Sequence, residues 1–236
     1  MTMRVLLAAI IAGMIAGAVA GAFQIWRVSP LILAAEVYEN QPDAGAAHAP
    51  GIAGIPAEHG TYANEVWAPE DGIERIAYTL LADLIMGVGF ALVLAAAVMF
   101  TGRGITPQNG VIWGLVGFLV FTLAPTAGLA PELPGMPAAD LVARQTWWWG
   151  TAIATAGGIG LIVLKKCIPY RTLGAALIAA PHIIGAPHAV SHDSAVPAAL
   201  AADFAANSLA MMALFWIVLG LTMGWALNRP NMTAES

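Results

Sequence analysis

Residues 76–100 read IAYTLLADLIMGVGFALVLAAAVMF, and this stretch decides the class of fold. At about 1.5 Å per residue, a helix of this length crosses the roughly 30 Å hydrocarbon core of a membrane. Asp83 is the one residue of the stretch that is charged at neutral pH. The stretch therefore predicts a transmembrane helix.

The rest of the chain repeats this pattern. It is 59% hydrophobic and only 10% charged, whereas soluble domains carry about 25% charged residues, so a soluble domain is excluded. We predict an all-α, polytopic membrane helix bundle that forms one domain over residues 1–236. About six spans, as three antiparallel hairpins, are expected at 5–26, 76–100, 111–129, 147–164, 172–185 and 204–227, with an outer loop at 27–75. The fifth is short and contains Pro181, so five spans is the alternative.

The distribution of charge predicts the orientation. With the N-terminus inside, the cytosolic segments hold six of the nine Lys and Arg residues, in agreement with the positive-inside rule. The three outer loops, together with the outer end of the fifth span for His182, then hold all five histidines and twelve of the fourteen acidic residues. Both termini are therefore expected in the cytoplasm, while the outer face presents imidazole and carboxylate groups, which are ligands for divalent metals.

The first span has two features of its own. Gly13, Gly17 and Gly21 recur every fourth position, a spacing that lets transmembrane helices approach closely. The triplet 18–20, Ala-Val-Ala, also resembles a signal-peptide cleavage site. Because the apolar run continues to Trp26, we favour a retained spanning helix over a cleaved signal peptide.

The second half contains a weak internal repeat. Residues 123–145, LAPTAGLAPELPGMPAADLVARQ, share their spacing of Pro, Gly and Pro-Ala-Ala with residues 179–204, AAPHIIGAPHAVSHDSAVPAALAADF. Spans three and four would then form one hairpin, and spans five and six a second copy, with Pro30 hinting at a third. Repeated units are common in transporters, whose substrate sites lie near helices interrupted by Gly or Pro.

The strongest candidate metal cluster is PHIIGAPHAVSHDS at 181–194, which supplies His182, His188, His192 and Asp193. On a helix, His188 and His192 would share one face and could bind one ion. His182 follows Pro181, where a broken helix would leave carbonyls and an imidazole facing a cavity. The alternative is a solvated loop that happens to contain histidines.

Acidic residues form a second group of candidates. Glu36 and Glu39 follow Pro30 close to the membrane surface, where they could pass a cation inward or simply cap a surface helix. Asp83 lies inside a span, where an acid is costly unless it faces a cavity or a partner, and Arg75 is the alternative partner. Asp140 and Asp203 precede spans four and six and are read first as helix N-terminal residues.

Several other functions are excluded or disfavoured. The chain has no H-E-x-x-H, G-x-S-x-G or Walker motif, so we expect no enzyme. No basic patch suggests nucleic-acid binding, and the single cysteine, Cys167, excludes an internal disulfide. The methionines lack a repeated Met-x-x-Met pair, which favours core packing over copper binding.

Three stretches together resemble the CbtA-type predicted cobalt transporter subunit family: SPLILAAEVYE at 29–39, LAPTAGLAPELPGMPAADLVARQTWWWGTA at 123–152 and AAPHIIGAPHA at 179–189. The resemblance implies a multi-pass protein of the bacterial inner membrane that serves cobalamin synthesis. It also implies a small single-span partner of the CbtB type. His182, Glu36 and Glu132 are the positions of this chain that match the motifs, whereas His188, His192 and the loop residues His48 and His59 lie where the motifs end.

From these observations we expect a permease that takes up Co²⁺ as cargo, holds no permanent cofactor and contacts membrane lipids. The candidate transport-path residues are His182, His188, His192, Glu36, Glu132, Asp193 and Asp83. Imidazole and carboxylate select cobalt weakly, so a nickel, zinc or other divalent-cation permease is the first alternative. A membrane assembly subunit that does not itself transport is the second.

Overall fold

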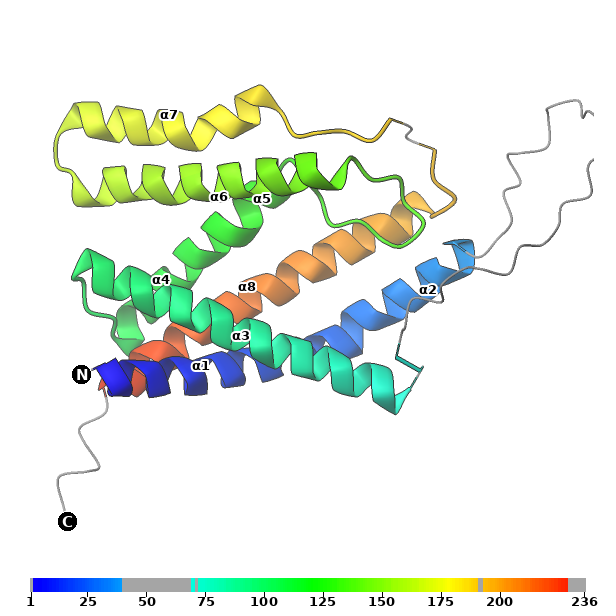
Figure 1. Ribbon diagram of the computed structural model, residues 1–236, viewed down its shortest axis with the longest axis horizontal. Helices are drawn as coiled ribbons and strands as arrows, with labels where there is room; N and C mark the ends of the chain where they lie inside the picture. Colours follow the sequence, from blue (N-terminus) through cyan, green and yellow to red (C-terminus); the bar gives the residue numbers. More distant parts are fainter. Residues whose placement is uncertain (1, 40–68, 71, 191–192, 229–236) are drawn as a thin grey trace, which may run out of the picture.

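The computed structural model describes residues 2–39, 69–70, 72–190 and 193–228, and these are helical with no strand (Figure 1). The helices are α1 (Thr2–Phe23), α2 (Ser29–Glu39), α3 (Ile73–Thr101), α4 (Pro107–Phe118), α5 (Ala124–Thr126), α6 (Leu141–Leu164), α7 (Ile168–Ile184) and α8 (Ala198–Asn228). Two π-helical turns, η1 (Gln24–Val28) and η2 (Leu119–Leu123), join α1 to α2 and α4 to α5. The predicted all-α bundle is confirmed.

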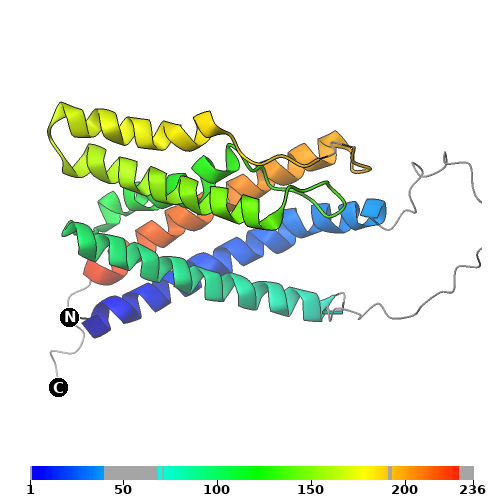
Figure 2. The ribbon, with the colours of Figure 1, turned by 45° about the horizontal axis from the view of Figure 1, so that its top comes forward.

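The chain runs back and forth along the bundle, so its connections fall at two ends. Five helical segments are long and apolar enough to cross a membrane: 3–38, 73–101, 107–126, 141–164 and 198–228. The sixth, α7, has 17 residues, or about 25 Å, and runs antiparallel to α6 in both views (Figures 1 and 2). The described residues thus form six long helical segments, of which five are long and apolar enough to cross a membrane.

The start of α1 and the end of α8 lie at one end of the bundle, together with the α3–α4 and α6–α7 connections (Figure 1). We call this the terminal end, and it carries Arg4, Arg103, Lys165, Lys166 and Arg171. The end of α2, the start of α3 and the α5–α6 connection lie at the opposite end, together with the end of α7 and the start of α8, and we call this the loop end (Figure 1). The charge separation that the sequence predicted is therefore present along the long axis of the bundle.

The first span is longer than predicted. We expected it to end at Trp26, but the helix passes through η1 and continues as α2 to Glu39. Pro30 has no N–H to donate, and its ring collides with the carbonyl four residues earlier in a regular helix. The wider turn relieves this conflict, since the Ser29 N–H donates to the Gln24 carbonyl, five residues back.

The same device appears in the third span. There the Ala124 N–H donates to the Leu119 carbonyl, and Pro125 follows at once. In each case the π-helical turn ends two residues before the proline. The similarity between Pro30 and the repeat prolines, which the sequence suggested, therefore has a structural counterpart at Pro125. Pro181 has none: α7 continues past it to Ile184, and the predicted break at Pro181 is wrong. Because Pro181 lies in the last turn, its missing N–H leaves only one bond unmade near the helix end.

Glycines bring three pairs of described helices into backbone contact, and two of these pairs build the core. In α1, Gly13 and Gly17 lie against the backbone of Gly87 and Asp83 of α3, which confirms the predicted role of the glycine stripe. In the second pair, Gly110 of α4 lies against Gly220 of α8. Helix α1 also packs against α8, so α1, α3, α4 and α8 form the core of the bundle.

The pairing of the other helices differs from the repeat. We expected spans three and four to pair, and five and six; instead α4 packs against α8, and α6 packs against α7. The reason is the position of the glycines: Gly110 and Gly220 fit each other, and so do Gly158 of α6 and Gly174 of α7. The α6–α7 pair joins the core through η2 and α5 (Figure 2).

Candidate functional site

The loop end holds most of the candidate metal ligands. Glu36 lies on α2, Glu132 lies between α5 and α6, and His182 lies in the last turn of α7. His188 and Asp193 lie in the connection from α7 to α8. His192, His48 and His59 lie outside the described residues.

Glu36 is bound to an arginine of the next helix. Its Oε1 lies 3.0 Å from Arg75 Nη2, and its Oε2 lies 3.5 Å from Arg75 Nη1. Arg75 belongs to the first turn of α3, so this two-pronged pair ties α2 to α3. A cation can use Glu36 as a ligand only if this pair opens or shares the carboxylate.

Glu132 is held in the same manner. Its Oε2 lies 2.9 Å from Nη2 of Arg144, which belongs to the first turn of α6. A cavity of about 320 Å³ lies beside the pair, and the indoles of Trp148 and Trp149 line it. The two motif glutamates are thus both bound by an arginine at the start of the helix that follows them. Neither pair was predicted from the sequence.

The two described histidines differ in their surroundings. His182 is exposed, and its ring makes an edge contact with Trp147 of α6 at 6.0 Å between centroids. His188 is exposed in a stretch without helical structure. The expectation that His188 shares a helix face with His192 is therefore wrong for His188: Gly185 has a φ of 89° and ends α7, and Pro187 follows. The next helix, α8, begins only at Ala198.

No three of these ligands come together among the described residues. The described ranges contain no group of three or more His, Cys, Asp or Glu side chains that could hold a metal ion. Two of the candidates, Glu36 and Glu132, are instead paired with an arginine. Metal binding by the individual candidate residues stays a prediction.

Asp83 is the candidate that lies deepest in the bundle. Its side chain is 4% exposed and is enclosed between α1 and α3. A methyl group on Gly21 would lie 3.0 Å from Asp83 Oδ2, so the absent side chain of Gly21 provides the space for the carboxylate. Oδ2 has no hydrogen-bond partner in the described part of the chain, and the alternative of pairing with Arg75 is wrong because Arg75 binds Glu36.

The two acids that we placed at helix starts behave differently. Asp140 is the N-cap of α6, and its Oδ1 accepts a hydrogen bond of 2.9 Å from the Ala143 N–H, as predicted. Asp203 lies inside α8, because that helix starts at Ala198, six residues before the predicted span. Two helical turns of α8 therefore extend from the predicted membrane boundary towards the loop end.

Buried hydroxyls near the centre of the bundle were not identified from sequence. Thr151 Oγ1 donates to the Trp147 carbonyl at 2.9 Å, the usual arrangement for threonine in a membrane helix. Thr122 and Thr155 are equally buried, but their hydroxyls have no partner in the described residues. The sequence does not distinguish these buried threonines from others, because threonine is common in apolar helices and does not interrupt their hydrophobic pattern.

Comparison with known proteins gives one clear result. No curated protein and no solved structure matches the chain. The model of one family, described as "Probable cobalt transporter subunit (CbtA)", matches residues 2–228, which is nearly the whole chain. The matched range includes the glycine-packed core, both carboxylate–arginine pairs and the described histidines. The chain therefore belongs to the CbtA family of probable cobalt transporter subunits.

Proposed function

We propose that this chain is the membrane subunit through which Co²⁺ enters a bacterial cell, with the loop end facing outward. The observation that carries the proposal is the separation of charge: the described imidazoles and most of the described carboxylates lie at the loop end, whereas five of the eight described Lys and Arg residues lie at the terminal end. Acidic groups around an entrance raise the local concentration of cations. Family membership supports the choice of cobalt.

The positive-inside rule supports the orientation, which places both termini in the cytoplasm and the protein in the inner membrane. A membrane potential that is negative inside would then draw a divalent cation inward. It contributes about 2.3 kcal/mol per charge per 100 mV, and thus roughly twice that for Co²⁺. No hydrolysis of ATP by this chain enters the proposal.

The exposed imidazoles of His182 and His188 are the side chains that would first exchange for water on the ion. Glu36 and Glu132 would act differently, because each is already neutralised by an arginine. We propose that each pair keeps its own carboxylate neutralised until a cation competes with the guanidinium for it, while the other acidic residues of the loop end attract the cation. Transfer of the cation to either glutamate would loosen α2 from α3, or the α5–α6 connection from α6.

Asp83 is the next carboxylate inward along the bundle, about two helical turns beyond Arg75. An acid within a span is retained at a cost of roughly 2.5–3.5 kcal/mol on insertion scales, so it calls for a role beyond packing. We propose that Asp83 receives the cation once α1 and α3 separate at their glycine contact. The π-helical turn η1 begins three residues after Gly21, the glycine that faces Asp83, and is a natural place for the helix to bend.

A family described as a transporter subunit implies further subunits. We propose a small single-span protein of the CbtB type as the partner and cobalamin synthesis as the destination of the cobalt. The partner would supply histidine ligands to the entrance, where this chain contributes His182 and His188 singly.

The test is uptake of radioactive cobalt into proteoliposomes with an imposed potential, for this chain alone and together with the small partner. We expect potential-dependent cobalt uptake that excess nickel or zinc reduces only weakly. Equal uptake of nickel and cobalt would reassign the cargo within the same architecture. No flux of any of these ions, with or without the partner, would reject the transporter and favour an assembly subunit.

A further inference from the structure

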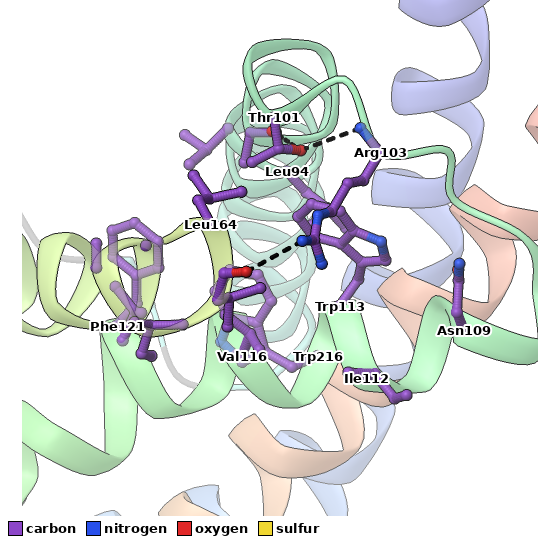
Figure 3. Close-up of a pocket in the computed structure, with 18 of the residues that line it drawn as sticks. Leu94, Thr101, Arg103, Asn109, Ile112, Trp113, Val116, Phe121, Leu164 and Trp216 are labelled. Atoms are coloured by element: carbon purple, nitrogen blue, oxygen red, sulfur yellow. Dashed lines mark hydrogen bonds between the residues drawn. The ribbon is translucent and has the colours of Figure 1, made fainter. Parts of the chain in front are cut away.

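A second cavity, larger than the one beside Glu132, lies towards the terminal end and takes no part in the proposed cation path. It has a volume of about 530 Å³ and lies between α3, α4 and α6, with Trp216 of α8 at its base (Figure 3). Its walls are apolar over most of their area, including Ile112, Val116 and Leu164. An apolar cavity of this kind does not suit a hydrated metal ion.

One end of the cavity is cationic. Arg103, in the connection from α3 to α4, turns its guanidinium towards the cavity and donates from Nη2 to the Val163 carbonyl at 3.1 Å (Figure 3). No carboxylate pairs with Arg103 in the described ranges, so its positive charge is not neutralised there. Lys165 and Lys166 follow directly after the lining residue Leu164 and are exposed. Arg103 is therefore the cationic side chain that lines the terminal end of this apolar cavity, while Lys165 and Lys166 follow its wall residue Leu164 in sequence without lining it.

This combination of an apolar chain-binding space and a cationic rim matches a phospholipid with an anionic headgroup. Basic pockets between membrane helices bind such lipids, and each basic residue near the surface contributes about five-fold to the affinity. A helix of another subunit fits less well, because one helix turn with its side chains already occupies roughly 420–610 Å³. The cavity has room for one such turn, whereas a single acyl chain is thin enough to lie along it.

We propose that this cavity is a binding site for an anionic phospholipid, with one acyl chain between α3, α4 and α6 and the phosphate on Arg103. The lipid would fill the gap between the α6–α7 pair and the core, where α6 otherwise contacts the core chiefly through η2 and α5. The site is independent of the proposed metal path, and its failure would leave that path untouched.

Lipid retention after purification tests the headgroup contact. The protein is equilibrated in detergent with equal amounts of phosphatidylglycerol and phosphatidylcholine, and the bound lipid is quantified by native mass spectrometry. We expect the wild-type protein to retain phosphatidylglycerol preferentially and Arg103→Gln to lower that preference about five-fold. Arg171→Gln is the matched control, because Arg171 is exposed at the same end but does not line the cavity. No preference in the wild type, or equal losses in the two variants, would overturn the proposal.

Two glycines of α6 test the acyl-chain position. Gly160 lines the cavity and Gly157 does not, and a methyl group on either would meet no other atom within 4 Å. The Cβ of a residue at position 160 would therefore point into open space, so we expect leucine there to occupy the cavity, and Gly157→Leu is its control. We expect Gly160→Leu to reduce the bound phosphatidylglycerol several-fold and Gly157→Leu to leave it unchanged. Unaltered retention in Gly160→Leu would exclude this cavity as the site.

A photocrosslinker distinguishes a lipid from another polypeptide. Benzoylphenylalanine in place of Ile112, which lines the cavity and is 63% exposed, should yield an adduct with the mass of a phospholipid in native membranes. The same residue in place of Ile153, which is 66% exposed on α6 and does not line the cavity, is the control. An adduct with a second polypeptide at position 112 would show that a protein occupies the cavity, and the lipid site would be rejected.

Discussion

The crossing of α1 with α3 and the crossing of α4 with α8 are packed in the same way, but they enclose different side chains. Each has a glycine–glycine backbone contact, Gly13 with Gly87 in the first and Gly110 with Gly220 in the second. Beyond that contact, the first crossing encloses the carboxylate of Asp83. The second encloses the indole of Trp216, which stacks on Phe121 with 5.7 Å between ring centroids.

The difference separates packing from function. The burial of Trp216 stabilises the second crossing, because a buried aromatic ring adds contact area and stacking. Asp83 adds neither, and an ionisable group in a span opposes insertion. Since the same glycine spacing supports a stable crossing around Trp216, the carboxylate in the other crossing is not needed for packing. It is therefore the position where we expect function to depend on a residue that stability does not require.

The largest effect should come from breaking the backbone contacts themselves. A side chain at Gly220 would run into the carbonyl of Gly110, and one at Gly87 would run into the carbonyl of Gly13, both of which are backbone and cannot yield. We expect Gly220→Val and Gly87→Val to lose more than about 3 kcal/mol of stability and to yield little folded protein, because overpacking against backbone has no rotamer that relieves it. The measurement is the monodisperse fraction in size-exclusion chromatography.

Gly89→Val provides the control for this first prediction. Gly89 lies two residues from Gly87 on α3, and a methyl group there meets no atom within 4 Å. We expect this variant to remain folded. Similar losses in Gly89→Val and Gly87→Val would mean that helix propensity, and not the helix crossing, controls stability.

The second prediction concerns Asp83, the carboxylate enclosed at the crossing of α1 with α3. Asp83→Asn keeps the shape of the side chain and removes its charge, so we expect folding to be retained while cobalt uptake falls at least about tenfold. Uptake into proteoliposomes and thermal unfolding of the same preparation are the two measurements. Thr155→Val is the matched control, because it removes another buried polar atom without a partner in the described residues. Normal uptake by Asp83→Asn would remove Asp83 from the path.

The third prediction concerns the loop end. We expect His182→Ala and Glu36→Ala to lower cobalt uptake several-fold, by removing an exposed imidazole and a carboxylate that exchanges with the cation. His48→Ala and His59→Ala, in the outer loop, should change uptake much less. The comparison is made at a cobalt concentration below saturation, where ligand loss is most visible. Equal and negligible effects of all four substitutions would reject the entrance model.

The smallest effects should appear at the carboxylate–arginine pairs. Side chains of Glu36, Arg75, Glu132 and Arg144 are each 27–37% exposed, and partly exposed ion pairs contribute at most about 1 kcal/mol. We therefore expect Glu36→Gln and Glu132→Gln to lower the unfolding temperature by only a few degrees, and less at high salt. A loss as large as that of Gly87→Val would show that the pairs hold the bundle together and do not merely balance charge.

Local features were predictable where they depend on neighbours in sequence. Apolar length placed α3 within three residues at its start and one at its end, since the predicted 76–100 became Ile73–Thr101. The Gly13, Gly17 and Gly21 stripe and the Asp140 cap also followed from spacing alone. The π-helical turns did not, because a proline predicts a conflict with the preceding carbonyl but not whether the helix ends or widens to accommodate it.

By itself, the sequence determined a membrane-embedded helical bundle with opposite chemistry at its two ends, because hydropathy and charge are summed along the chain. Only the tertiary structure decided that α4 pairs with α8, that α6 pairs with α7, and that Arg75 and Arg144 take up Glu36 and Glu132. Those choices depend on complementary surfaces contributed by residues far apart in sequence. Gly110 and Gly220 meet because both lack a side chain at the same level of the bundle. Their positions in the sequence do not reveal this match, which depends on how the two helices are placed in space.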